Sequence, residues 1–95
     1  MDAEPITFLG RPLGPSFQRR TVTIRPGGTR PYEEAEWRDA LVVVECGAVV
    51  VEYHAGGRRT FGTGDLLWLT GMGVRALHNE GPDTAVLVAV SRRHP

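Results

Sequence analysis

The sequence predicts an all-β fold of antiparallel strands, a sandwich or small barrel with little or no helix. Short apolar runs rich in β-branched residues alternate with glycine-rich turns about every eight to twelve residues. Between residues 17 and 90, no apolar repeat of about 3.6 residues is long enough for a stable helix. A chain of 95 residues has the size of one domain. We therefore expect an extended N-terminal arm over residues 1–16, where three of the seven prolines lie, and one barrel domain over residues 17–95.

Composition and charge exclude several classes of protein. Eleven arginines balance eleven acidic residues, which gives no electrostatic reason to expect a nucleic acid or an anionic membrane as a partner. No apolar run approaches the roughly 18 to 20 residues that cross a bilayer. The N-terminus lacks the basic start and long apolar stretch of a signal peptide. We expect a soluble, cytoplasmic protein, and the single cysteine, Cys46, excludes an intrachain disulfide and a cysteine-rich zinc site.

Alternation and turn residues predict the first strand. Residues 17–24 alternate apolar and polar side chains, as a half-buried strand does, and Pro26-Gly27-Gly28 ends this strand. Residues 29–39 have no obvious apolar face. Their acidic residues are compatible with a helical turn, but we favour an extended segment at the edge of a pocket.

Two valine-rich runs follow at residues 40–45 and 48–53, with Cys46-Gly47 between them. Valine is a poor helix former and a good strand former, so we expect a tight hairpin. Both runs are apolar on both faces, whereas one face of a two-layer sandwich normally meets water. This pattern predicts a homodimer that covers the outer faces of these strands.

Residues 64–79, GDLLWLTGMGVRALHN, predict two more strands around a glycine-rich bend. The first of these strands is apolar on both faces, and we place Trp68 in the core. Asp65 follows a turn glycine, so we expect its side chain to accept hydrogen bonds from backbone amides. After a turn at residues 80–83, residues 84–90 form the last apolar strand.

The spacing within residues 64–79 resembles the second motif of the cupin family of small jelly-roll barrels. That motif reads Gly, five residues, Pro-x-Gly, two residues, His, three residues, Asn. Gly64 and Asn79 lie at its two ends, while Thr70 and Met72 stand at the Pro and second Gly positions. Arg75 stands at the position of the metal-binding His.

The first cupin motif is matched only at its final glycine. That motif contains a His-x-His pair and a Glu, followed after six residues by a Gly. Counted back from Gly47, the Glu position is Ala40, and the two His positions are Glu36 and Glu34. The resemblance covers about residues 17 to 90 and implies a small single-domain, conserved-barrel cupin with degenerate metal-binding motifs.

The resemblance also identifies the candidate site. In the family, the three His and the Glu hold a divalent metal inside the barrel. Arginine stays protonated and offers a cation no acceptor, so we predict no metal and no cofactor. Arg75, Glu34 and Glu36 instead occupy positions that converge in the family, with the two glutamate Cα atoms about 6 to 7 Å apart on one face of an extended segment. This predicts a barrel cavity lined by arginine and glutamate.

Aromatic and histidine residues complete the prediction. Tyr32 and Trp37 add flat apolar surface near the same end of the barrel, as the wall of a small-molecule pocket. For Trp37, a subunit contact stays an alternative. If Arg75 points inward, strand alternation sends His78 to the other face, and we expect His78, like His54 and His94, to be a solvated surface residue.

Three functions follow, in order of preference. The first is metal-independent binding of a small polar or anionic molecule, with Arg75 as the anchor and Glu34, Glu36, Trp37 and Tyr32 around it. The second is an isomerase, epimerase or cyclase that uses Glu34 or Glu36 as its catalytic general base. The third is a dimeric structural or interaction module whose barrel is filled by its own side chains.

Overall fold

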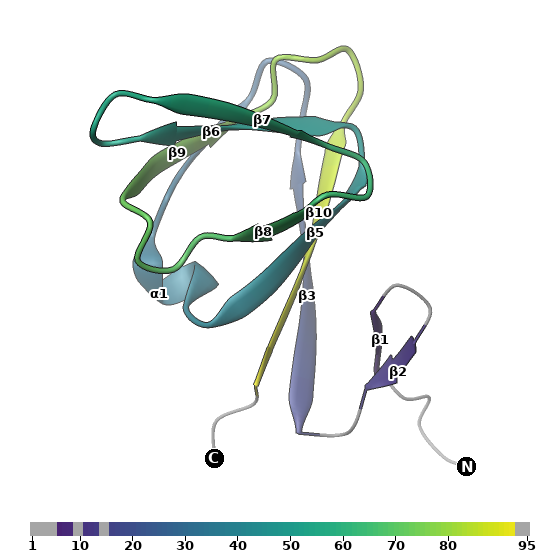
Figure 1. Ribbon diagram of the computed structural model, residues 1–95. Helices are drawn as coiled ribbons and strands as arrows, with labels where there is room; N and C mark the ends of the chain where they lie inside the picture. The colour runs from purple at the N-terminus through teal and green to yellow at the C-terminus, as the bar shows by residue number, and fades with distance from the viewer. Residues whose placement is uncertain (1–5, 9–10, 14–15, 93–95) are drawn as a thin grey trace.

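The computed structural model describes residues 6–8, 11–13 and 16–92. Within these residues the chain forms short strands and one single-turn helix (Figure 1). The strands are β1 (Ile6–Phe8), β2 (Arg11–Leu13), β3 (Phe17–Ile24), β4 (Thr29–Pro31), β5 (Ala40–Cys46), β6 (Ala48–Tyr53), β7 (Arg58–Gly62), β8 (Leu66–Trp68), β9 (Val74–His78) and β10 (Ala85–Arg92), and the helix is α1 (Glu34–Trp37).

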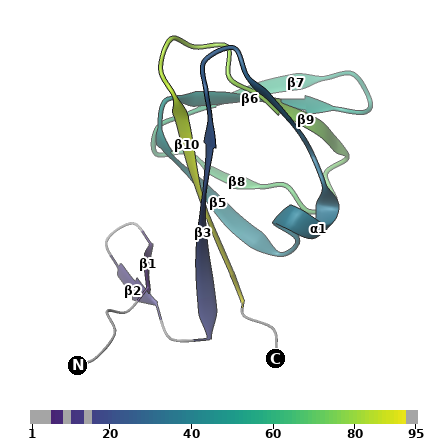
Figure 2. The same cartoon turned by 180° about the vertical axis from the view of Figure 1, so that it is seen from behind.

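Two four-stranded sheets face each other as a sandwich (Figure 1). The strand order is β3-β10-β5-β8 in the first sheet and β4-β9-β6-β7 in the second sheet. Every pairing is antiparallel among the described strands. Strands β1 and β2 form a separate hairpin beside β3, on the side away from α1 (Figures 1 and 2). The predicted all-β fold is confirmed. The described residues of the predicted N-terminal arm form this hairpin of paired strands.

The two valine-rich runs form β5 and β6, which belong to different sheets. The predicted tight hairpin between them is therefore wrong. Only Gly47 separates the two strands, which leaves too few residues for a two-residue hairpin turn. Gly47 adopts a φ of 77° and turns the chain from one sheet to the other.

The inner faces of both sheets meet in one apolar core. Its fully buried members come from both layers and include Val44, Val49, Leu77 and Leu87. Burial of each such side chain contributes about 1.5 to 3 kcal/mol relative to exposure. The core also includes Trp37 of α1, which is 0 % exposed. The interior of the sandwich is thus packed with the protein's own side chains at this position.

The extended segment predicted over residues 29–39 is confirmed at β4 and wrong at residues 34–37, where the chain forms α1. Tertiary contacts stabilise this helical turn, because Trp37 packs into the core. The sequence of the segment shows no apolar face from which this could be predicted. Thr70 holds the end of the helix: its hydroxyl donates to the Trp37 carbonyl (3.1 Å) and accepts from the Asp39 amide (2.9 Å). The residue at the motif's Pro position therefore fixes the end of α1.

Polar side chains fix two of the turns. Asp65 Oδ2 accepts from the Gly62 amide at 2.8 Å, which confirms the predicted role of Asp65. Asn79 is 1 % exposed, and its Nδ2 donates to the carbonyls of Ile24 and Asp83, both at 2.8 Å. The last residue of the motif thus joins the end of β3 to the turn before β10.

Strand β8 has the two apolar faces that the sequence predicts, but Trp68 is on the outside. Its side chain is 49 % exposed, while Leu67 beside it is 3 % exposed. Alternation along the strand places one residue of three in the core. The predicted core position of Trp68 is wrong.

None of the helical structure in the described residues is long and apolar enough to cross a bilayer.

A matched pair of glycine variants tests the crossing between the sheets. Gly47 and Gly27 have nearly equal φ values, 77° and 78°, so alanine at either position meets a similar backbone cost of about 1 to 2 kcal/mol. A Cβ at position 47 would lie 2.8 Å from the Thr84 carbonyl oxygen, whereas a Cβ at position 27 meets nothing within 4 Å. We expect Gly47→Ala to lower the free energy of unfolding by at least about 1 kcal/mol more than Gly27→Ala does, measured by urea denaturation. Equal losses of unfolding free energy in the two variants would contradict the close approach of the Thr84 carbonyl to position 47.

Candidate functional site

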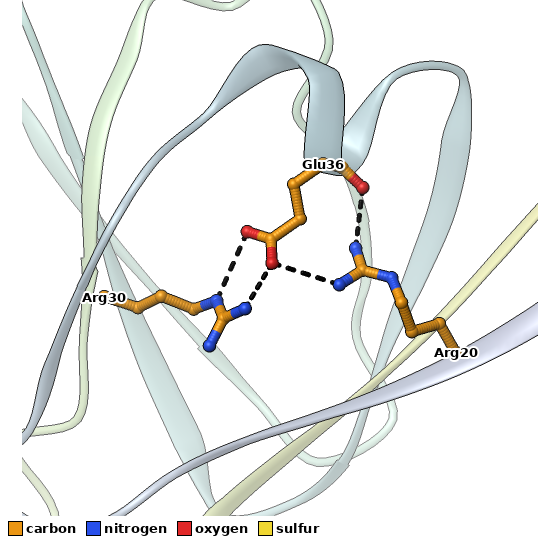
Figure 3. A network of polar contacts seen from close by, with 3 residues as sticks. All are labelled: Arg20, Arg30 and Glu36. Atoms are coloured by element: carbon orange, nitrogen blue, oxygen red, sulfur yellow. Dashed lines mark hydrogen bonds and ion pairs between the residues drawn. The ribbon is translucent and has the colours of Figure 1, made fainter.

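A carboxylate on α1 lies between arginines from the two sheets (Figure 3). Arg20 of β3 donates from Nη1 to Glu36 Oε2 (3.1 Å) and from Nη2 to the Glu36 carbonyl (2.6 Å). Arg30 of β4 donates from Nε to Glu36 Oε1 (3.3 Å) and from Nη2 to Oε2. We call these three residues the arginine clamp. Both carboxylate oxygens are engaged, so the clamp joins α1 to both layers.

Strand alternation turns both arginines toward the inner side of the sandwich. Arg20 lies two residues before Val22, which belongs to the core, and opposite the buried Ala89. Arg30 lies opposite the buried Leu77. The Arg20 guanidinium carbon is 5.1 Å from the centroid of the Trp37 ring, within the range of a cation–π interaction.

The clamp controls the protonation state of Glu36. Hydrogen bonds from Arg30 are the largest cause that lowers the pKa of Glu36, and the hydrogen bond and charge of Arg20 act in the same direction against the opposing effect of burial. The same hydrogen bond raises the pKa of Arg30. Glu36 is therefore ionised and a weak base at neutral pH. Two guanidinium groups on one carboxylate leave an excess positive charge.

A cavity of about 370 Å³ lies beside the clamp, between α1 and strands β3 and β10. Its polar lining comes from Gln18, Arg19, Arg20, Glu36, Arg38 and Ser91, and three alanines complete it. We call this cavity the arginine pocket. Its lining has three arginines and one glutamate; Arg19 pairs with Glu45, so Arg20 and Arg38 against Glu36 make it an electropositive site.

Arg75, the predicted anchor, is exposed. The register between β6 and β9 shifts between Glu52 and Tyr53, which face Ala76 and Val74. This bulge leaves Arg75 as the extra residue, so that Val74 and Leu77 both enter the core while Arg75 points outward. The prediction that Arg75 turns into the barrel is wrong, and a ligand-binding role for it stays a prediction.

Glu34 and Glu36 do not form the predicted carboxylate pair. They lie two residues apart on a helix, where side chains at that spacing do not face each other. Glu34 is exposed and accepts a 2.8 Å hydrogen bond from the hydroxyl of Tyr32. Burial raises the pKa of Tyr32, and the hydrogen bond to Glu34 raises it further. Tyr32 packs against the core as a half-buried residue beside α1.

Trp37 is a core residue and neither an open pocket wall nor an exposed subunit contact. Its Nε1 is the one buried side-chain nitrogen or oxygen without a hydrogen-bond partner among the described residues. The Trp37 ring packs against the clamp, because the guanidinium of Arg20 lies over its face.

The residues at the family's four metal positions do not fit a divalent cation. Ala40 has no donor atom, and Arg75 is a cation that points outward. Glu36 is bound by two arginines, and Glu34 is exposed and bonded to Tyr32. Across the described part of the chain, no three His, Cys, Asp or Glu side chains come together as a metal site would need.

A second polar group lies on the outer face of the other sheet. His78 is half-buried, with Nδ1 2.9 Å from Thr29 Oγ1 and Nε2 2.8 Å from Glu52 Oε1. The hydrogen bond to His78 is the largest cause that lowers the pKa of Glu52. His78 does lie on the face opposite Leu77, but it is bonded and not merely solvated. His54 is exposed at its turn, and His94 lies outside the described residues.

The sequence predictions missed Arg20, Arg30 and Arg38. For Arg20 the sequence held one indication. It lies two residues before Val22 and four before Ile24, so its side chain faces the same side of β3 as theirs. For Arg30 and Arg38, no sequence pattern shows that α1 brings them to one end of the sandwich.

Comparison with protein-family models finds no match, and comparison with curated proteins finds no relative. Solved structures do match. A sugar phosphate isomerase of the cupin superfamily from Silicibacter pomeroyi is 24 % identical, with a TM-score of 0.61 over 84 % of this chain and 52 % of that chain. A Cupin 2 conserved barrel domain protein from Salinispora arenicola is 17 % identical, with a TM-score of 0.63 over 90 % of this chain and 68 % of that chain.

A third structure, the Cupin 2 domain of an XRE family transcriptional regulator from Enterobacter cloacae, is 19 % identical. Its TM-score is 0.58, over 84 % of this chain and 83 % of that chain. These likenesses show the fold: the chain is a small domain with the cupin fold, as the motif spacing predicts. The chain spans about half the length of the isomerase.

Replacement of Glu36 tests the clamp. Glu36→Gln keeps the shape of the side chain but leaves two arginines without their counter-charge, and we expect the free energy of unfolding at pH 7 to fall by about 1.5 to 3 kcal/mol. The folded pKa of Glu36 lies below the unfolded value of about 4.3, so its contribution is complete above that pH and disappears as the pH falls through the folded pKa. The variant should therefore lose less stability on acidification than the wild type.

Glu34→Gln is the matched control on the same turn, because Glu34 is exposed and binds no arginine. Urea denaturation at several pH values measures both variants. Equal effects of the two substitutions would show that the clamp does not stabilise the fold.

Proposed function

Because the chain has the cupin fold, we propose that it is a small-molecule-binding domain that holds a small anion in the arginine pocket without a metal. The charge of the pocket carries this proposal. Two lining arginines, Arg20 and Arg38, accompany the one lining carboxylate, Glu36, while the third, Arg19, pairs with Glu45. Glu36 already accepts hydrogen bonds from Arg20 and from Arg30 outside the pocket lining. An anionic ligand would neutralise the excess charge.

The chemistry of the lining suits a phosphate or carboxylate group. Arginine presents a planar set of donors that matches both groups in two-point hydrogen bonds. Arg38 carries no hydrogen bond or ion pair among the described contacts, so its guanidinium is available. Gln18 and Ser91 add neutral donors to the pocket lining, and Gln18 Nε2 donates to Ser91 Oγ at 3.4 Å.

The size of the pocket limits the ligand to a small molecule. A volume of about 370 Å³ lies at the lower end of small-molecule sites, which span about 300 to 1,000 Å³. One structure of the same fold is a sugar phosphate isomerase, so a sugar phosphate is a suitable probe.

The structure favours binding over general-base catalysis. An isomerase, epimerase or cyclase needs a base whose pKa approaches the working pH. The clamp lowers the pKa of Glu36, which moves this group away from that requirement. Glu34 is exposed and bonded to Tyr32, outside the arginine pocket.

Calorimetric titration tests the proposal with ribose 5-phosphate as the probe and neutral ribose as its control. We expect saturable binding of the phosphate ester, no binding of ribose, and lower affinity at higher salt because exposed charges are screened. Arg38→Ala should weaken binding about tenfold or more, the equivalent of one lost charge-assisted hydrogen bond. Treatment of the protein with a chelator before the titration should leave its affinity for ribose 5-phosphate unchanged.

Arg75→Ala is the matched control, because Arg75 is exposed on β9 and is not among the residues that line the pocket. Its affinity should equal that of the wild type. If Arg75→Ala abolishes binding while Arg38→Ala does not, the anchor is the residue that the motif indicates and the arginine pocket is not the site. If no phosphate or carboxylate compound binds, the proposal fails.

A further inference from the structure

Three side chains on the outer face of the second sheet form a chain of two hydrogen bonds. Oγ1 of Thr29 on β4 lies 2.9 Å from Nδ1 of His78 on β9, and Nε2 of His78 lies 2.8 Å from Oε1 of Glu52 on β6. Strand β9 lies between β4 and β6, so the three groups come from adjacent strands. We call these three residues the outer triad. A hydroxyl, an imidazole and a carboxylate in this order are the groups that activate a nucleophile.

The carboxylate of Glu52 determines which nitrogen of His78 carries the proton. The hydrogen bond to His78 is the largest cause that lowers the pKa of Glu52, so this carboxylate is ionised at neutral pH and can only accept. Nε2 of His78 therefore donates to Glu52, and in a neutral imidazole Nδ1 is then the acceptor for the Thr29 hydroxyl. The two ring nitrogens exchange the roles that they have in the Ser-His-Asp triad. Nδ1 is thus placed to take the hydroxyl proton.

The hydroxyl of this triad borders a cavity. Thr29 is exposed, while the side chains of His78 and Glu52 are 19 % and 31 % exposed. Thr29 is one of the residues that line a cavity of about 460 Å³ between the end of β3 and β4. We call it the edge cavity, and its lining consists of residues 23–25 and 28–31. A small molecule in the edge cavity would lie next to the Thr29 hydroxyl.

The backbone amide of Thr29 is a further donor at this cavity. The Gly28 carbonyl accepts from the Asn79 amide at 3.0 Å, so these residues form a hydrogen-bonded pair of β4 and β9. Bonded and non-bonded pairs alternate along an antiparallel ladder, so Thr29 and His78 form a non-bonded pair. The Thr29 amide therefore points away from β9, to the free edge of β4. There it can stabilise the oxyanion that forms when Oγ1 attacks a carbonyl carbon.

Positive charge in the edge cavity indicates the kind of substrate. Arg25 and Arg30 belong to the lining, and no acidic residue does among the described ones. Arg30 is bound by Glu36 of the arginine clamp. Arg25 is exposed and has no ion pair in the part of the chain that the structure describes. Its guanidinium is thus available to a carboxylate or phosphate group.

We propose that the outer triad is a second site, which hydrolyses small esters that carry an anionic group. Thr29 is the nucleophile, His78 is the general base, and Glu52 is a positioning residue that fixes the tautomer of His78. The edge cavity and the arginine pocket share no lining residue. The base is an imidazole and not a glutamate, so this inference does not depend on anion binding in the arginine pocket.

The reaction needs only the ester and water. Oγ1 of Thr29 attacks the carbonyl carbon while Nδ1 of His78 takes the hydroxyl proton. The bond from the carbonyl carbon to the leaving alcohol breaks, and the imidazolium returns this proton to the leaving oxygen. Water then attacks the acyl carbon and gives a proton to Nδ1, which passes it to Oγ1 as the bond to the acyl group breaks. The products are a carboxylic acid and an alcohol, without oxidation or reduction.

Hydrolysis of a chromogenic ester by the full chain tests this site. The probe is 3-acetoxy-4-nitrobenzoate, and 2-nitrophenyl acetate is the matched ester without the carboxylate. We expect the anionic ester to react at least about tenfold faster, and mass spectrometry of peptides to find an acetyl group on Thr29. Thr29→Val keeps the shape of the side chain without the hydroxyl and should abolish both signals. His78→Gln should lower the rate at least about hundredfold.

Two variants are matched controls, and a third tests the charge. Thr60 is an exposed threonine on β7 of the same sheet, and His54 is an exposed histidine at a turn. Thr60→Val and His54→Gln should both keep the wild-type rate. Arg25→Ala should slow hydrolysis of the anionic ester at least about tenfold and leave the rate with 2-nitrophenyl acetate unchanged.

Glu52→Gln tests the positioning role. The amide of glutamine can donate to Nε2, which moves the imidazole proton to Nδ1 and removes the acceptor for the Thr29 hydroxyl. We expect kcat to fall at least about tenfold with KM unchanged, and nitrogen magnetic resonance to find the His78 proton on Nδ1 instead of Nε2. Absence of hydrolysis, wild-type rates in Thr29→Val or His78→Gln, or acetyl groups only on other residues would each overturn the proposal.

Discussion

The arginine clamp is the contact on which the candidate site depends. Strands β3 and β4 are edge strands of different sheets, and they do not pair with each other. Glu36 binds an arginine from each of them and so links the two layers at this end of the sandwich. Removal of one partner leaves a partly buried charge without its counter-charge, which costs more than the ion pair itself contributes.

The clamp also determines where a ligand has room. It holds the one-turn helix that inserts Trp37 into the core, so the protein's own side chains fill the interior beside the clamp. The arginine pocket lies at the edge, between α1 and β3. Positive charge is provided there by the guanidinium groups of the lining, and the proposed anion would bind to them. The positive charge of the arginine pocket and the packing of Trp37 in the core thus both depend on the arginine clamp.

Sequence patterns predicted the fold well because turns and strands have local causes. Glycines at positions such as 47 and 64 adopt positive φ, and the spacing from Gly64 to Asn79 matches the turns that the structure forms. The same patterns did not show which sheet each strand joins. The hairpin of the two valine runs was therefore wrong, although both runs are strands.

The candidate site was predicted less well, and the reasons are physical. A bulge opposite Glu52 and Tyr53 reverses the alternation on β9, and a single-residue bulge leaves no mark in an apolar pattern. It turned Arg75 outward. One helical turn is too short to show a period of 3.6, so the approach of Glu36 to Arg20 and Arg30 depends on tertiary contacts that sequence order does not contain.

The most direct test of the central claim is a nuclear magnetic resonance titration with ribose 5-phosphate that follows the Nε–Hε groups of the arginines. If the arginine pocket holds the anion, the signals of Arg20 and Arg38 shift and saturate together, while those of the exposed Arg58, Arg59 and Arg75 do not move. Small shifts that spread over all exposed arginines and rise linearly with concentration would contradict the account.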